Sequence, residues 1–163
     1  MFKLFLTSLL MLAGWACPGD GQCAEPGGAD RSILLALAAE SDAYWNAADA
    51  GGMAAMFAED ADLRIADRVS LRSRERIRGY FEASFAQRPA GLFHVTEIVG
   101  LREIAPGVVL ADGLVRLERA RPDGRRELLR RFANHTLVVR EDGRWWFKSL
   151  RAHPLADAPP PAG

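Results

Sequence analysis

The chain has 163 residues, of which 49% are hydrophobic and 26% charged, so it can bury the core of one ordinary domain. Its 21 basic and 21 acidic residues give a net charge of zero, which argues against nucleic acid as a partner because phosphate binding needs a cationic surface. With two cysteines, three histidines and no zinc, phosphate-loop or dinucleotide motif, we expect no disulfide scaffold, no metal and no cofactor.

The first residues are typical of an export signal. Lys3 precedes an apolar run, Leu4 to Ala16, that is too short for a transmembrane helix, so we expect no membrane span. We take residues 1–24 as the signal peptide. Cleavage after Ala16 also fits the pattern and would leave Cys17 at the new N-terminus, open to a lipid anchor. We favour export without lipid, because Gly14 stands where lipoprotein signals usually carry Leu. The protein is therefore predicted to be periplasmic or secreted.

The hydrophobic period predicts three helices after a flexible linker at 25–30. The first begins near Arg31, with Asp30 as its cap, and ends at Gly51-Gly52. The second, at 53–58, is short and apolar. Asp60-Ala61-Asp62 ends it, and the short strand 63–65 follows. The third helix starts after Ser73, which is predicted to be its cap.

From Gly91 onward the period changes from 3.6 to 2, which predicts long antiparallel strands. Asp-Gly pairs and a Pro-Gly pair between them are typical of hairpin turns. The strands are predicted at 92–101, 108–118, 127–139 and 145–152. Helices followed by strands indicate an α+β domain over residues 31–153, and the Pro-rich residues 154–163 are predicted to be a disordered tail.

Several stretches resemble one family. YWNAADAG at 44–51, MFAEDADL at 56–63, RERIR at 74–78 and DGRWWF at 142–147 are similar to the nuclear transport factor 2-like superfamily, and most of all to its SnoaL-like branch. The resemblance covers about residues 31–153. It implies a cone-shaped, curved antiparallel sheet with the three N-terminal helices packed on its concave face around a pocket. It implies less about activity, because the superfamily includes isomerases, cyclases, dehydratases and non-catalytic domains.

Ketosteroid isomerase belongs to the same superfamily, and its site suggests catalytic candidates. That enzyme holds its substrate oxygen with a tyrosine and a protonated acid, and an aspartate is the base. The resemblance places Tyr44 at the tyrosine and Asn134, a neutral donor, at the acid. The base position falls on Ile65, which cannot take a proton. We expect Asp67 or His153 to replace it, and the residues that could face the pocket are Asp67, Asp42 and His153.

The expected pocket is mostly apolar and suits a small hydrophobic or aromatic ligand. Its oxygen would lie between the Tyr44 hydroxyl and the Asn134 amide. We predict binding of such a molecule, with weak cofactor-free acid–base chemistry at most. The alternatives are an isomerase, cyclase or dehydratase and a non-catalytic interaction module. The other expected ligand-binding residues are Trp45, Phe81, Phe85, Phe132, Thr136 and Arg151.

The strands also suggest a partner and exclude a metal. His94, His135 and His153 fall on three strands, but alternation turns His135 away from Asn134, so we expect no shared metal site. The outward side chains of the sheet are too apolar for water, which predicts a homodimer through this face. These side chains are Leu129, Leu137, Val139, Trp146 and Leu150.

Overall fold

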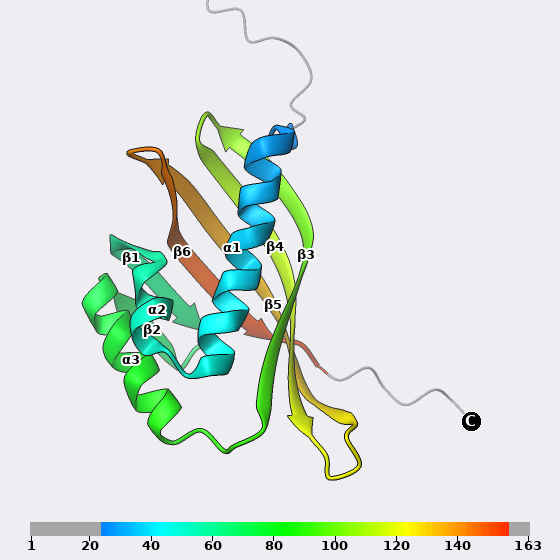
Figure 1. Cartoon of the computed structure of the whole chain (residues 1–163). Helices are drawn as coiled ribbons and strands as arrows, with labels where there is room; N and C mark the ends of the chain where they lie inside the picture. The colour runs from blue at the N-terminus through cyan, green and yellow to red at the C-terminus, as the bar shows by residue number, and fades with distance from the viewer. Residues whose placement is uncertain (1–23, 157–163) are drawn as a thin grey trace, which may run out of the picture.

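The computed structural model describes residues 24–156, which form three helices and six strands (Figure 1). All but the last residue of the predicted signal peptide, Cys17 included, and most of the predicted tail therefore lie outside the described residues. In chain order the elements are α1 (Gly28–Ala47), α2 (Ala50–Ala55), β1 (Phe57–Ile65), β2 (Val69–Arg72), α3 (Arg74–Ala86), β3 (Leu92–Ala105), β4 (Val108–Ala120), β5 (Arg126–Glu141) and β6 (Arg144–Pro154).

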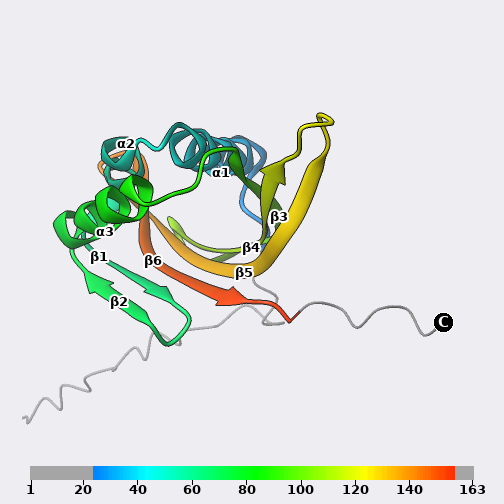
Figure 2. The ribbon, with the colours of Figure 1, turned by 90° about the horizontal axis from the view of Figure 1, so that it is seen from below.

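All six strands form one curved sheet in the order β2-β1-β6-β5-β4-β3, and the three helices cover its concave side (Figure 2). The α+β class and the four long strands are confirmed. The sheet is mixed, however, because β1 runs parallel to β6 while every other pair is antiparallel. No hairpin joins β1 to β6, so their relative direction is free of the constraint that makes hairpin strands antiparallel.

The boundary between the first two helices differs from the prediction. Helix α1 ends at Ala47, and the glycine pair lies inside α2, where the Asp49 side chain accepts from the Gly52 N–H at 2.8 Å. A Cβ on Gly52 would lie 2.2 Å from the Tyr44 ring. These glycines therefore let α2 pack closely against α1 instead of ending it. At the other end α1 begins at Gly28, so Asp30 lies in its first turn and is not its cap.

A strand replaces the last two residues of the predicted apolar helix. Strand β1 begins at Phe57 and runs through the acidic stretch that was expected to end a helix. Short apolar runs are ambiguous between helix and strand, and pairing with β6 decides this one. The prediction for α3 is confirmed, because the Ser73 hydroxyl accepts from the Arg76 N–H at 3.4 Å.

The core lies between the helices and the concave face of the sheet. Its largest fully buried side chains come from β1, α3, β4 and β5, so every layer contributes. Within residues 24–156 no helix is long and apolar enough to cross a membrane. The fully buried side chains are Phe57, Leu63, Ile77, Val109, Val115 and Val138.

Candidate functional site

Helix α1 lies along the free edge of β3, whose other edge pairs with β4 (Figure 1). Asn46, in the last turn of α1, makes two hydrogen bonds to the backbone of His94 in β3. Its Oδ1 accepts from the His94 N–H at 2.7 Å, and its Nδ2 donates to the His94 carbonyl at 3.0 Å. The amide thus takes the place of a neighbouring strand and fixes the position of His94.

Asp42, one turn earlier on the same side of α1, binds the next part of β3. Its carboxylate accepts from the Thr96 N–H, the Thr96 hydroxyl and the His94 ring, each at 2.7 Å. An ionised carboxylate only accepts hydrogen bonds, so the hydrogen lies on His94 Nδ1 and Nε2 is left as the acceptor. Asp42 and His94 therefore form an oriented acid–imidazole pair.

The environment of Asp42 keeps it ionised. Burial disfavours the charged form and raises its pKa. The hydrogen bonds from His94 and Thr96, together with the electrostatic attraction of the His94 ring, act in the opposite direction and outweigh burial. The pKa of Asp42 is therefore lowered from its ordinary value of 3.8. A carboxylate that stays charged can stabilise a proton on the neighbouring imidazole.

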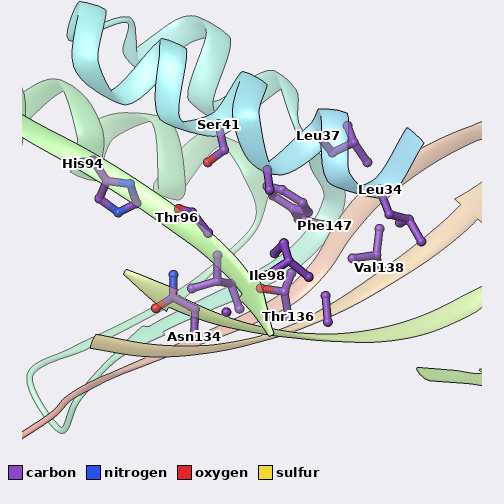
Figure 3. A pocket seen from close by; sticks show the side chains of 14 residues that line it. Leu34, Leu37, Ser41, His94, Thr96, Ile98, Asn134, Thr136, Val138 and Phe147 are labelled. Carbon is purple, nitrogen blue, oxygen red and sulfur yellow. The ribbon is translucent and has the colours of Figure 1, made fainter. Parts of the chain in front are cut away.

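The pair lies beside a cavity with two chambers. The outer chamber, of about 220 Å³, lies between α1, α3 and the sheet and is lined by aromatic and aliphatic side chains. The inner chamber, of about 50 Å³, lies under α1 and is lined mainly by aliphatic side chains and Phe147 (Figure 3). Four residues border both chambers. Three of these are polar and form what we call the polar belt: Ser41, His94 and Asn134.

Asn134 brings an unpartnered acceptor to the polar belt. Its Oδ1 is buried and has no hydrogen-bond partner among the described residues. Buried side-chain oxygens are nearly always paired, since an unpaired one costs about 1–3 kcal/mol. The amide therefore has unused capacity to bind a hydroxyl or N–H group of a ligand.

Most of the predicted lining residues border the cavity. Trp45, Phe81 and Phe132 line the outer chamber, and Thr136 lines the inner one. The Trp45 ring also lies against the His94 ring, with centroids 5.1 Å apart. Phe85 is not among the residues that line either chamber. It packs behind the outer chamber against Trp45 and Phe81, at centroid distances of 6.0 and 5.5 Å. Contact of these predicted lining residues with a ligand remains a prediction.

Tyr44 does not line either chamber, so the expected pair of Tyr44 and Asn134 does not form. Its hydroxyl donates to Glu40 at 2.7 Å, which raises the Tyr44 pKa, and its ring faces Gly52 in α2. Residues two apart are about 200° apart around a helix. Because Asp42 is bound to β3, Tyr44 faces away from β3.

The expected replacements for the base also lie elsewhere. Asp67 is exposed in the β1–β2 turn, in a separate surface cleft. In β6, Leu150 and Ala152 line the outer chamber, so alternation directs Arg151 and His153 to the convex face. Arg151 there donates to Asp62 at 2.8 Å, and exposed His153 lies near His135. The expectation that Leu150 points outward is wrong for the same reason.

Asp42, the third residue that could have faced the pocket, reaches the cavity wall only through its contact with His94. The sequence had suggested His94 only as one of three metal candidates. Among residues 24–156 no group of three or more His, Cys, Asp or Glu side chains could hold a metal ion. The sequence did contain a signal for the contact between α1 and β3. Asp42 and Asn46 are four residues apart, so they lie on one side of the helix.

The described fold contains a SnoaL-like domain. The model of the SnoaL-like domain family matches residues 29–151, so the chain belongs to this family. Among curated proteins, none matches the chain.

Solved structures share the fold at low sequence identity. A domain of unknown function with a cystatin-like fold from Nostoc punctiforme is 22% identical, covers 80% of each chain and has a TM-score of 0.71. A candidate scytalone dehydratase from Novosphingobium aromaticivorans is 16% identical over 78% of this chain and 85% of its own, with a TM-score of 0.68. A hexachlorocyclohexane dehydrochlorinase from Novosphingobium barchaimii is 18% identical over 81% and 96%, with a TM-score of 0.65.

The lowered pKa of Asp42 predicts a pH dependence of stability. A depressed folded-state pKa stabilises the fold above the unfolded-state pKa, and this contribution is lost as the pH falls through the folded-state value. We expect Asp42→Asn to lower the free energy of unfolding by about 2 kcal/mol at neutral pH. The difference from the unsubstituted protein should shrink below pH 3.8. Urea denaturation of both proteins, once at neutral pH and once below pH 3.8, measures this difference in the free energy of unfolding.

Asp67→Asn, in the exposed turn, is the control and should change the free energy of unfolding little at either pH. A difference between the Asp42→Asn and unsubstituted proteins that stays constant down to pH 2 or so would show that the ionisation of Asp42 is not what stabilises this contact.

Proposed function

We propose that the protein is a cofactor-independent enzyme of the elimination or isomerisation type, in which His94 removes a proton from a carbon atom of a small, mostly apolar molecule. The observation that carries this proposal is the oriented Asp42–His94 pair at the polar belt, between two apolar chambers. A base that is held in place inside a largely apolar cavity is what proton abstraction from carbon requires.

The chain supplies the parts of a proton transfer. Nε2 of His94 is the proton acceptor, and the Asp42 carboxylate stabilises the imidazolium that forms. The pair is only slightly exposed, with 19% of the His94 side chain and 17% of the Asp42 side chain accessible. Their attraction is therefore weakly screened by water. Trp45, packed against the imidazole, limits its movement.

Neutral donors are available for charge that develops on the substrate. The Asn134 amide lies at the polar belt, and Tyr80 lines the outer chamber. Burial raises the pKa of Tyr80, although its hydrogen bond with Ser84 acts in the opposite direction, so the hydroxyl stays protonated. Uncharged donors of this kind can stabilise an enolate-like oxygen.

The atoms and electrons of an elimination balance without a second reactant. His94 takes the proton, the electron pair of the C–H bond forms the double bond, and a leaving hydroxyl departs as water with the proton from His94. Two of the structures with this fold are named for eliminations, a dehydratase and a dehydrochlorinase. Ile65, where ketosteroid isomerase would have its base, lines the outer chamber as an apolar residue. Elimination is therefore the version of the proposal that we favour.

The proposal is tested with 5-nitrobenzisoxazole, an aromatic probe that opens to a coloured cyanophenolate when a base removes its C–H proton. We expect the protein to accelerate this reaction on the order of 100-fold more than His94→Gln does, because that substitution removes the acceptor nitrogen. Asp42→Asn should give an intermediate rate. Absorbance of the phenolate measures the initial rates.

A second Asp–His pair provides a matched control. His135 contacts Asp112 at the same Nδ1–Oδ1 distance of 2.7 Å, but it lies on the convex face with 51% of its side chain exposed. His135→Gln should leave the rate unchanged. Equal rates for His94→Gln and the unsubstituted protein would contradict the proposed role of His94.

We also propose that the protein dimerises through the convex face of the sheet. Leu114, in the middle of β4, is 40% exposed on this face, opposite its buried neighbours Gly113 and Val115. We expect sedimentation to give the mass of two chains, and Leu114→Arg to give that of one because it places a charge in the interface. Ile33→Arg, on the exposed side of α1, should remain dimeric. A single-chain mass for the unsubstituted protein would contradict the dimer.

We propose in addition that the protein is exported and cleaved after Ala16. Cleavage after Ala24 would remove a residue that the fold uses, because the Ala24 carbonyl accepts from the Glu103 N–H at 2.9 Å. Mass spectrometry of the protein from its native host should show a chain that begins at Cys17. A chain that begins at Glu25 would contradict this cleavage site, and an intact chain in the cytoplasm would contradict export.

A further inference from the structure

The middle of β4 contains a glycine that neither the backbone nor the packing requires. Gly113 is buried, and its φ does not lie in the left-handed region that favours glycine. A Cβ at this position would lie 3.5 Å from Thr96 Cγ2 and 3.7 Å from Ile98 Cδ1, which are ordinary contacts. Glycine weakens a strand interior, so a residue with a side chain would be favoured here on grounds of stability alone.

The missing side chain leaves space in the cavity. Gly113 lines the inner chamber, and the two atoms nearest to its absent Cβ on side chains belong to Thr96 and Ile98, which line it too. In the sheet Gly113 is paired with Asn134 of β5, whose Oδ1 is unpartnered. The space above Gly113 is therefore next to the polar belt, where His94 would take its proton.

The rest of the inner chamber is apolar. Leu34 and Leu37 of α1 and Val138 of β5 enclose the end away from His94 and Asn134 (Figure 3). A cavity of about 150 Å³ holds the six carbon atoms of benzene, which is about 25 Å³ per carbon. By that measure the 50 Å³ inner chamber holds about two carbons.

We propose that Gly113 determines specificity: the space left by its missing side chain accepts a short, unbranched apolar substituent of the substrate, about two carbons long, next to the reacting atom. The ring or larger part of the substrate lies in the outer chamber. This inference rests on the proposed function only in taking His94 as the reacting end, because the subsite itself is defined by binding.

The probes are phenol and its 2-methyl, 2-ethyl, 2-propyl and 2-butyl derivatives, with affinities measured by titration calorimetry. The ortho position is chosen because a hydroxyl at the polar belt and a chain in the inner chamber must be on neighbouring atoms. We expect affinity to rise about fourfold for each carbon up to ethyl, the usual gain for burying a methylene group, and to fall for butyl.

Gly113→Ala should shift this optimum by one carbon. Phenol and 2-methylphenol should bind as before, and 2-ethylphenol should bind weaker by more than about fourfold, the gain of one methylene, so that 2-methylphenol becomes the best ligand. The variant should also melt at a slightly higher temperature, since alanine suits a strand interior better. Ala38→Leu, which fills the same chamber from α1, should weaken 2-ethylphenol similarly.

Gly79→Ala is the matched control, because Gly79 lies in α3 and a Cβ there meets nothing within 4 Å. It should keep the binding profile of the unsubstituted protein. Affinity that does not depend on chain length in the unsubstituted protein, or an identical profile in Gly113→Ala, would overturn the inference. If the chain-length profile holds while His94→Gln leaves the elimination rate unchanged, the proposed chemistry fails and the subsite stands.

Discussion

The free edge of β3 is the constraint on which the site depends. An edge strand exposes unpaired N–H and carbonyl groups, and covering it with a helix requires side chains that replace the missing strand. Asp42 and Asn46 provide them, so the same hydrogen bonds that satisfy the His94 and Thr96 backbone also attach α1 above the concave sheet. The cavity under α1 and the orientation of His94 are both consequences of this attachment.

Comparison of the two Asp–His pairs shows why burial matters. Asp112 and His135 have the same contact distance as Asp42 and His94, but they lie on the convex face, where Arg102 also approaches Asp112 at 3.8 Å. Water screens that pair, and no chamber adjoins it among the described pockets. The two similar pairs therefore differ in the chemistry that is open to them, because the curvature of the sheet encloses only Asp42 and His94.

The cavity also retains features that are unfavourable for stability. The Asn134 side chain has a buried oxygen without a partner among the described residues, and opposite it stands Gly113, a weak strand former. Both lie at the same point of the concave face, beside the polar belt. Residues that break the rules of stable packing tend to collect at functional sites, where a ligand supplies the missing contact. The two residues together define the place where we expect a substrate to be held.

The sequence by itself determined the α+β class, the helix cap at Ser73 and the four long strands, because caps, turns and a period of 2 are local signals. The family resemblance also pointed to Asn134, which borders both chambers. The error at Phe57 has a physical origin as well, because the pairing of β1 with β6 is a long-range contact that a short apolar run does not encode.

Only the tertiary structure decided which residues meet at the site. Asp42 and His94 are 52 residues apart, so their contact exists only when α1 is docked on β3. The rotation of α1 was not fixed by its hydrophobic period, which allowed Tyr44 to face the pocket. The hydrogen bonds of Asp42 and Asn46 turn Tyr44 toward α2 instead. Likewise, the direction of His153 followed from its place in β6, where pairing with β5 directs alternate side chains to opposite faces.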